Sequence, residues 1–355
     1  MHQKEDEQIF SGNINFFYTF DVGEDINLKA AKKNLALYIT PRELPSYLRS
    51  YHKPLTVELK SHNGLTKALY ANIHHFGVIS TVYQIPFKGT LESLREKIND
   101  LHAQYQEQSI DDVHQLFLKI TSHVSQPKFF HKKNHYLVIQ IDPKESLKDS
   151  KKLREQYGAL IASTLRFEKT TLSEQQVEDI LESATGYYRE DLVVIDTEAA
   201  FVYDKSPEEL FDFFELALIQ QVELQYFDDL LDNKLDAVYQ NTLEKPSWRN
   251  CLPFIGTMYD AIGELSKMKV DISVITERLG NTIKTGGEAY YSEIYNLLVD
   301  TFELNEWHVS IEKKLAIIRD VKTIYQSKVN AIREDMFSLL ITILIFVELL
   351  VGIFK

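Results

Sequence analysis

The feature that most constrains this chain is its C-terminal segment, MFSLLITILIFVELLVGIFK, which occupies residues 336–355. As a helix rising about 1.5 Å per residue, the 19 residues from Met336 to Phe354 would extend about 28 Å. That length matches the roughly 30 Å hydrocarbon core of a bilayer. Large apolar side chains would cover every face of this helix, whereas a helix packed on a soluble core keeps a polar face. We therefore predict one transmembrane helix over residues 336–354.

The remaining 335 residues are typical of soluble globular domains. Charged residues make up 26% and aromatic residues 12% of the chain, and the length is enough for two domains. The N-terminus, MHQKEDEQIF, has neither the apolar core of a signal peptide nor the Arg-rich, acid-poor composition of a transit peptide. We therefore expect a single-pass protein whose soluble part faces the cytoplasm, or the mitochondrial matrix if the protein is organellar.

Composition also limits the classes of partner. Cys251 is the only cysteine, so a disulfide framework or a zinc knuckle within one chain is excluded. The formal net charge of −13 argues against nucleic acid as a partner. The membrane, a second copy of the chain and a protein of unknown identity are the partners that we expect.

The first part of the chain, residues 10–145, is predicted to be an α+β domain. Its strand-like runs are rich in β-branched and aromatic residues, and a helical spacing of apolar residues lies between them. The predicted strands are Asn15–Phe20, Ala68–Ile73, Phe76–Tyr83 and His135–Asp142, and the predicted helix is Leu91–Tyr105. Gly77 indicates a bulge or a close approach of two backbone segments.

Residues 147–303 are predicted to form a mainly helical domain. Helices are expected over Lys151–Phe167 and Ser173–Ser183, where Ser173 and Gln176 have the spacing of a capping box. A short strand is expected at Asp191–Ile195.

A long helix, Glu208–Gln240, follows Pro207 at its first turn. Its mainly apolar stripe is interrupted by Gln221 and Asp228. Asp228, Asp229 and Asp232 share one face of this helix, and a solvated acidic face is favoured over a site for a hard cation.

Residues 304–335 are predicted to form an amphipathic stalk that continues into the transmembrane helix. Apolar residues recur at steps of three or four, without Gly or Pro before the span, so a helix from Asn305 to Phe354 would be about 75 Å long. The seam of this stalk contains Trp307, Ile311, Leu315, Ile318 and Tyr325. We expect its upper half to pack on the chain's own domain, and self-association competes with such packing near the membrane.

Two stretches resemble a known family. EAYYSEIYNLLVDTFELNEWHVSIEKKLAIIRDVKTIYQ (residues 288–326), followed by a span that reads LLITILIFVELL, resembles the C-terminal half of the family named "required for meiotic nuclear division". HHFGVIS (residues 74–80) and ALIASTLRFEK (residues 159–169) are similar to its upstream parts. The features that match are Tyr291, Tyr295, Leu304, Trp307, Lys314, Leu315, Tyr325 and Glu348. The resemblance implies one C-terminal span, a large cytoplasmic or matrix domain and homo-oligomerisation.

No catalytic motif is present. The chain contains no P-loop pattern, no G-x-G-x-x-G, no H-E-x-x-H and no G-x-S-x-G. We therefore predict no enzymatic activity, no cofactor and no metal site. His74 and His75 would point to opposite faces of a strand, so they are poorly placed to bind one metal ion. A polar pocket around His74, His75 and His135 is the weakest of the candidate sites.

Glu348 lies near the middle of the predicted span. An ionised carboxylate at this depth is costly, by roughly 2.5–3.5 kcal/mol on insertion scales for the comparable Asp. Ser338 and Thr342 have the small-x-x-x-small spacing that lets two helices approach closely. We therefore expect Glu348, Ser338 and Thr342 to form an interhelical contact in a homo-oligomer. The alternative is that Glu348 reaches the membrane interface near Lys355.

These observations lead to a fold and a function. We expect an α+β N-terminal domain, a helical domain and one long C-terminal helix that runs into a single transmembrane span. The function that we expect is a membrane-tethered, non-enzymatic scaffold that homo-oligomerises and presents a soluble domain at the membrane. The first alternative is a ligand-sensing or enzymatic α+β domain on a membrane anchor. The second alternative is an ion-handling oligomer. It is disfavoured because magnesium transporters of the CorA type need two spans with a Gly-Met-Asn signature between them, whereas this chain has one predicted span and no such tripeptide.

Overall fold

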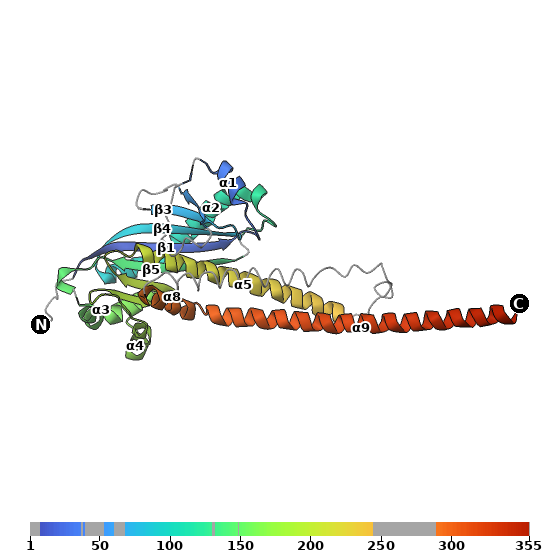
Figure 1. Ribbon diagram of the computed structural model, residues 1–355. Helices are drawn as coiled ribbons and strands as arrows, with labels where there is room; N and C mark the ends of the chain where they lie inside the picture. Colours follow the sequence, from blue (N-terminus) through green and yellow to red (C-terminus); the bar gives the residue numbers. More distant parts are fainter. Residues whose placement is uncertain are drawn as a thin grey trace. The chain divides into compact units, whose positions relative to one another are not determined.

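The computed structural model describes residues 8–36, 38–39, 53–59, 68–129, 132–147, 149–243 and 289–354 (Figure 1). The chain divides into two compact units. The first comprises residues 1–226 and 275–305, and the second comprises residues 227–274 and 306–355. Cys251 lies outside the described residues.

A seven-stranded mixed sheet forms the first unit, in the order β2-β3-β4-β1-β5-β7-β6. The strands are β1 (Phe10–Asp21), β2 (Leu55–Glu58), β3 (Ala68–Ile73), β4 (Val78–Gly89), β5 (Lys133–Ile141), β6 (Leu192–Ile195) and β7 (Ala199–Tyr203). All neighbouring pairs are antiparallel except β5 and β7. The parallel pair requires a crossover, which the helices between residues 141 and 199 provide.

The helices around the sheet begin where polar side chains cap them. The elements on the face that carries the main apolar core are α1 (Leu28–Asn34), α2 (Leu91–Ile120), α3 (Ser150–Leu165) and α4 (Glu174–Glu182), with short 3-10 turns at η2 (Thr121–His123) and η3 (Glu145–Leu147). Thr90 Oγ1 accepts a hydrogen bond from the backbone N–H of Ser93 at the start of α2. Ser173 makes its half of the predicted capping box, since Ser173 Oγ accepts from the N–H of Gln176, whereas the Gln176 amide donates to Asp179 Oδ2.

The two faces of the sheet follow from the alternation of side chains along β1. Phe16, Tyr18 and Phe20 point into the main core against α2, in line with the two-residue period of a strand. Phe17 lies on the opposite face, where its ring meets that of Phe211 in α5 (Glu208–Leu243). The sheet is therefore covered on both faces.

The sheet continues past the predicted domain boundary at residues 145–147. β6 and β7 pair with the same sheet as β1, and their apolar residues belong to the same core as Leu137 and Ile139. β6 was predicted from its sequence, but β7 was not. The predicted division into residues 10–145 and 147–303 therefore does not separate the two compact units.

The second unit contains most of α9 (Leu304–Ile353), a single helix of 50 residues. Ile311 and Ile318 of the predicted seam are buried, and Trp307 and Leu315 are half-buried. The side chain of Tyr325 lies outside the described residues. The remaining described helix, α8 (Ala289–Thr301), belongs to the first unit. The fold class predicted from the sequence is confirmed: a mixed sheet with helices, then a helical region, then one long C-terminal helix.

Candidate functional site

The apolar end of α9 is fully exposed. Residues Asn330–Ile353 form 24 residues of helix that is long and apolar enough to cross a membrane, and no part of its most apolar stretch is buried. Exposed apolar surface costs about 25 cal/mol per Å² in water, and contiguous patches of this size mark membrane or protein contacts. Such a helix is stable where lipid or another helix covers it.

Glu348, Ser338 and Thr342 lie on one side of this helix. At about 100° of rotation per residue, Thr342 lies about 40° from Ser338 in one direction and Glu348 about 80° in the other. From Met336 to Phe354, the remaining arc of about 240° carries only large apolar side chains. The Thr342 hydroxyl donates to the backbone carbonyl of Ser338 at 2.8 Å, so its hydrogen bond is made within the helix. The structure thus brings the three predicted residues onto one face.

The acidic cluster on α5 forms ion pairs with a lysine side chain of α9. Lys314 Nζ in α9 lies 2.8 Å from Asp228 Oδ1 and 2.6 Å from Asp232 Oδ1. Ser310 Oγ also donates to Asp228 Oδ1 at 3.1 Å. Asp228 is buried rather than solvated, which differs from the acidic face that we expected. Its position in the apolar stripe of α5 is explained by this ion pair.

The structure does not bring the three candidate histidines together. His74 and His75 follow β3, at the start of the turn that contains Phe76. The ring of His74 stacks on that of Phe76, with 5.2 Å between the two ring centroids. His135 lies opposite Tyr18 on β5, with β4 and β1 between it and β3. The Tyr18 side chain points to the α2 face.

The ring of His135 instead lies 4.6 Å from that of His102 on α2. Partial burial, and to a smaller extent the neighbouring His135, lower the pKa of His102 to about 4. A neutral imidazole is therefore the stable form in this pair. Sequence reasoning missed His102, since its partner lies on a strand 33 residues away and no local spacing joins them.

A row of polar side chains crosses five strands on the face that α5 covers. The register places Thr56 opposite Asn72, Asn72 opposite Ser80, Ser80 opposite Thr19, and Thr19 opposite Asn134. Thr56, Asn72, Ser80 and Thr19 are buried, and Asn134 is half-buried. We call these five residues the polar row.

Helix α5 carries the partners of the polar row. Glu215 Oε1 accepts from Asn72 Nδ2 at 2.6 Å and from Ser80 Oγ at 2.5 Å. Gln221 Oε1 accepts from Asn134 Nδ2 at 2.9 Å. Buried polar groups cost free energy unless they are hydrogen-bonded, so these bonds fix the position of α5 along the sheet. Gln221 is one of the two residues that interrupt the apolar stripe of α5, and this contact explains it.

Asp21 is a buried acid at the end of β1 on the same face. Its Oδ1 accepts from the N–H of Gly23 at 3.0 Å, and Oδ2 has no hydrogen-bond partner in the described part of the chain. Burial raises the pKa of Asp21 to about 7. Gly77 approaches the same turn, since a Cβ added to it would lie 1.8 Å from the carbonyl oxygen of Gly23. The close backbone approach predicted at Gly77 is confirmed.

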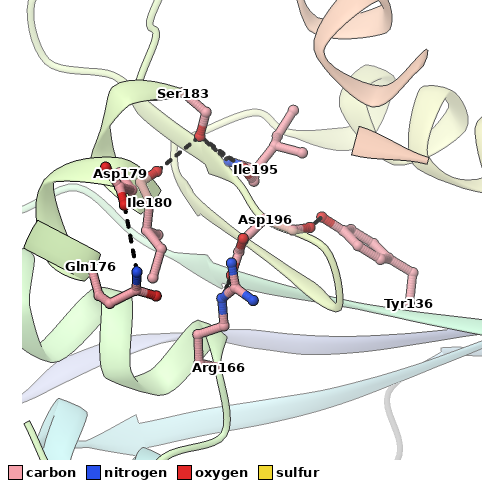
Figure 2. A network of polar contacts seen from close by, with 8 residues as sticks. All are labelled: Tyr136, Arg166, Gln176, Asp179, Ile180, Ser183, Ile195 and Asp196. Atoms are coloured by element: carbon pink, nitrogen blue, oxygen red, sulfur yellow. Dashed lines mark hydrogen bonds and ion pairs between the residues drawn. The ribbon is translucent and has the colours of Figure 1, made fainter. Parts of the chain in front are cut away.

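A second polar network joins α3 and α4 to the turn between β6 and β7 (Figure 2). Arg166 Nε lies 2.5 Å from Asp196 Oδ2, and Tyr136 donates its hydroxyl to the Asp196 carbonyl at 2.7 Å. Ser183 Oγ donates to the carbonyl of Ile195 at 2.8 Å and accepts from its N–H at 3.2 Å. Tyr136 of β5, Arg166 after α3 and Ser183 after α4 each bond to Ile195 or Asp196, so these contacts hold the β6–β7 turn in place.

The described residues offer few features of a catalytic site. They contain no group of three or more His, Cys, Asp and Glu side chains that is placed to hold a metal ion. A groove of about 740 Å³ lies beside α2. Four carboxylates, Glu58, Glu107, Asp111 and Asp112, line it together with Lys119. None of the predicted site residues lines this groove.

The sheet and its first helices match a described family. The family model named "Uncharacterized protein MJ0711, N-terminal domain" matches residues 11–209, more than half of the chain. The chain belongs to this family. The matched range contains all seven strands and ends two residues into α5. The polar row is therefore part of the family domain, whereas Glu215, Gln221 and α9 lie beyond the matched range.

A relative from Methanocaldococcus jannaschii, "Uncharacterized protein MJ0711", is 24% identical over 220 residues. The match covers 60% of this chain and 63% of the relative, so the chain spans less than two thirds of that protein's length. No solved structure matches the chain significantly. The resemblance to the family "required for meiotic nuclear division" remains a prediction.

Proposed function

We propose that this chain is a membrane-tethered, non-enzymatic scaffold or assembly protein that homo-oligomerises and presents its MJ0711-type domain at the membrane surface. The observation that carries the proposal is the unburied apolar helix Asn330–Ile353 at the end of α9. A hydrocarbon environment removes the cost of this exposed surface and leaves the soluble part beside the bilayer. The soluble part faces the cytoplasm, or the mitochondrial matrix if the protein is organellar.

The polar side chains of the domain support a structural rather than a catalytic role. Glu215 accepts hydrogen bonds from Asn72 and Ser80, and Lys314 pairs with Asp228. A catalytic acid or base has to reach a substrate, whereas these groups are directed at one another inside the protein. They position helices, and the surfaces of those helices are what a scaffold offers to its partners.

Glu348 supports the homo-oligomer. Glu348 lies about 4.5 Å along the helix axis from Ile345, near the middle of the apolar segment. Ionisable groups at this depth face a helix bundle or a polar cavity rather than lipid. Ser338 and Thr342 flank the same face and are small enough for a second helix to approach. We expect Glu348 to hydrogen-bond across this contact.

Membrane fractionation of the full chain tests the anchor. We expect the wild type to sediment with membranes and to resist extraction by alkaline carbonate. The double variant Leu344→Lys and Val347→Lys places two charges in the span, and we expect it to move largely to the supernatant. As a matched control, Lys313→Leu adds an apolar residue outside the span and should sediment as the wild type does. Wild-type protein in the supernatant after centrifugation without detergent would overturn the proposal.

Glu348→Leu tests the oligomer separately. We expect the native mass of the detergent-solubilised wild type to be a multiple of 41.2 kDa, and the variant to shift towards one copy. Ile343→Leu is the matched control, because residue 343 lies about 140° around the helix from both Ser338 and Glu348 and the change leaves the carboxyl group in place. An unchanged mass in Glu348→Leu would refute the role of this residue, whatever the fractionation shows.

A further inference from the structure

α9 has two apolar faces before it reaches the membrane. The first contains Ile311 and Ile318, which are buried within the second unit. The second contains Val309, Ile317 and Ile324, which are 47%, 51% and 55% exposed. At about 100° per residue, Ile317 and Ile324 lie about 100–120° around the helix from Ile318. Within the described part of the chain, one face of the stalk is therefore buried and the other is exposed.

The uncovered face has a seven-residue repeat that continues into the apolar segment. Six successive positions of this repeat are Ile317, Ile324, Ala331, Ser338, Ile345 and Gly352, and we call them the second stripe. All six are exposed, and none is charged, although seven of the 19 residues from Ile317 to Asp335 are charged. The stripe runs about 52 Å along one uninterrupted helix. Lipid solvation alone does not explain it, because Ile317 lies about 20 Å before Asn330.

We propose that the second stripe joins α9 of one copy to α9 of a second copy in parallel, from Ile317 in the stalk to Gly352 in the membrane. The inference rests on the proposed membrane anchor and names the face through which the oligomer forms. A seven-residue repeat keeps two helices in contact when they supercoil with a left-handed twist. Ala331, Ser338 and Gly352 allow the two backbones to approach closely, and a Cβ added at Gly352 would meet no atom within 4 Å.

A second copy fits this face better than an unrelated partner does. The partner helix must carry the same repeat in water and in lipid, run parallel, and offer a polar group at the depth of Glu348. A second α9 meets all these conditions, because its anchor enforces the same orientation in the same membrane. The symmetric pairing is of the self-complementary kind that two-fold dimers use. Anchoring also raises the effective concentration of one stalk around another.

Glu348 lies beside the stripe, three residues after Ile345, so the two copies bring their carboxyl groups together at one depth. The carboxyl group of one copy can hydrogen-bond to that of the other, which gives each a polar partner inside the membrane. A single α9 in lipid would have no second copy to offer Glu348 such a partner.

Cysteine crosslinking in native membranes tests the face. Single cysteines replace Ile317, Ile324, Ala331 or Ser338 in full-length protein that carries Cys251→Ser. Control cysteines replace Arg319, Arg333 or Leu340, each two residues after a stripe position and about 200° around the helix. A disulfide needs Cβ atoms about 3.5–4.5 Å apart, so we expect stripe positions to form at least about tenfold more dimer than the controls on oxidation.

The outcomes separate this inference from the proposed function. Equal crosslinking at stripe and control positions, or a maximum at the control positions, overturns the second stripe as the interface. Absence of any dimer overturns the interface and the oligomer together. In each case the membrane pellet of the same variants reports on the anchor alone, because it does not depend on the oxidant.

Discussion

Replacement of Glu215 by alanine is expected to destabilise the first unit by about 2–6 kcal/mol, since it removes the acceptor of two buried donors. Glu215 is 5% exposed, and its Oε1 accepts from Asn72 at 2.6 Å and from Ser80 at 2.5 Å. A buried donor that loses its only acceptor costs about 1–3 kcal/mol, which gives the range for two donors. Asn72 cannot turn away freely, because its Oδ1 accepts from Thr56 Oγ1 at 2.7 Å.

Glu215→Gln is the matched variant. It keeps a side-chain oxygen that can accept from both donors, so we expect a loss of only about 1 kcal/mol. Urea unfolding of the full chain in detergent micelles, followed by the near-ultraviolet circular dichroism of its tyrosines, measures both free energies of unfolding. The double variant with Ser80→Ala adds a thermodynamic cycle. Glu215→Ala should cost less in that background, because one of the two donors is already gone.

Three results would contradict this reasoning. A loss below about 1 kcal/mol for Glu215→Ala would mean that the two donors find other acceptors or water. Equal losses for alanine and glutamine would mean that the carboxylate charge, not its hydrogen bonds, stabilises α5. Strict additivity with Ser80→Ala would mean that the two residues do not interact in solution.

Three further predictions concern single residues outside the polar row. Asp21 has a pKa raised to about 7, so from about pH 4 to pH 7 the folded state retains a proton that the unfolded state releases, and stability falls as the pH rises. Asp21→Asn should therefore raise the melting temperature at pH 8 and change it much less at pH 4, and equal shifts at both would refute the burial of an unpaired carboxylate. Gly77→Ala should cost at least about 3 kcal/mol in urea unfolding, since Gly77 has φ +96° and its new Cβ would meet the carbonyl of Gly23; a melting temperature equal to that of the wild type would contradict the close approach. Lys314→Met should speed hydrogen exchange of α9 amides near residue 314, because it leaves Asp228 without its cation, and adding Asp228→Asn should restore slow exchange; a failure of this rescue would argue against the ion pair.

The features that follow from local pattern were predictable from the sequence. The long apolar helix at the end of α9 was predictable from composition alone, because the length of an apolar run can be counted without knowledge of the rest of the fold. The strand Asn15–Phe20 was found from its β-branched and aromatic residues, although β1 extends further at both ends. Gly77 was correctly interpreted, since only a backbone constraint explains a glycine inside a strand-like run.

The features that depend on register and long-range pairing were not predictable. β7 is a five-residue apolar run whose partner β5 lies about 60 residues earlier, and nothing local to Ala199–Tyr203 indicates that pairing. His74 and His135 were grouped by residue type, but the strand order separates them. Thr19, Thr56 and Asn72 of the polar row each lie between two apolar residues, a pattern that is also typical of the solvated side of a strand. Only Gln221, a polar residue in the apolar stripe of α5, indicated that a polar surface lies beneath that helix.

The continuity of α9 has a mechanical consequence. No glycine or proline occurs from Leu304 to Val351, so the helix has no built-in hinge along almost its entire length. In the membrane-anchored protein that we propose, a tilt or axial rotation imposed by a change in bilayer thickness would therefore be transmitted to Ile311 and Ile318, rather than absorbed near Asn330. A pair of glycines inserted near Asn330 would allow the helix to bend there, so the two ends of α9 would move independently.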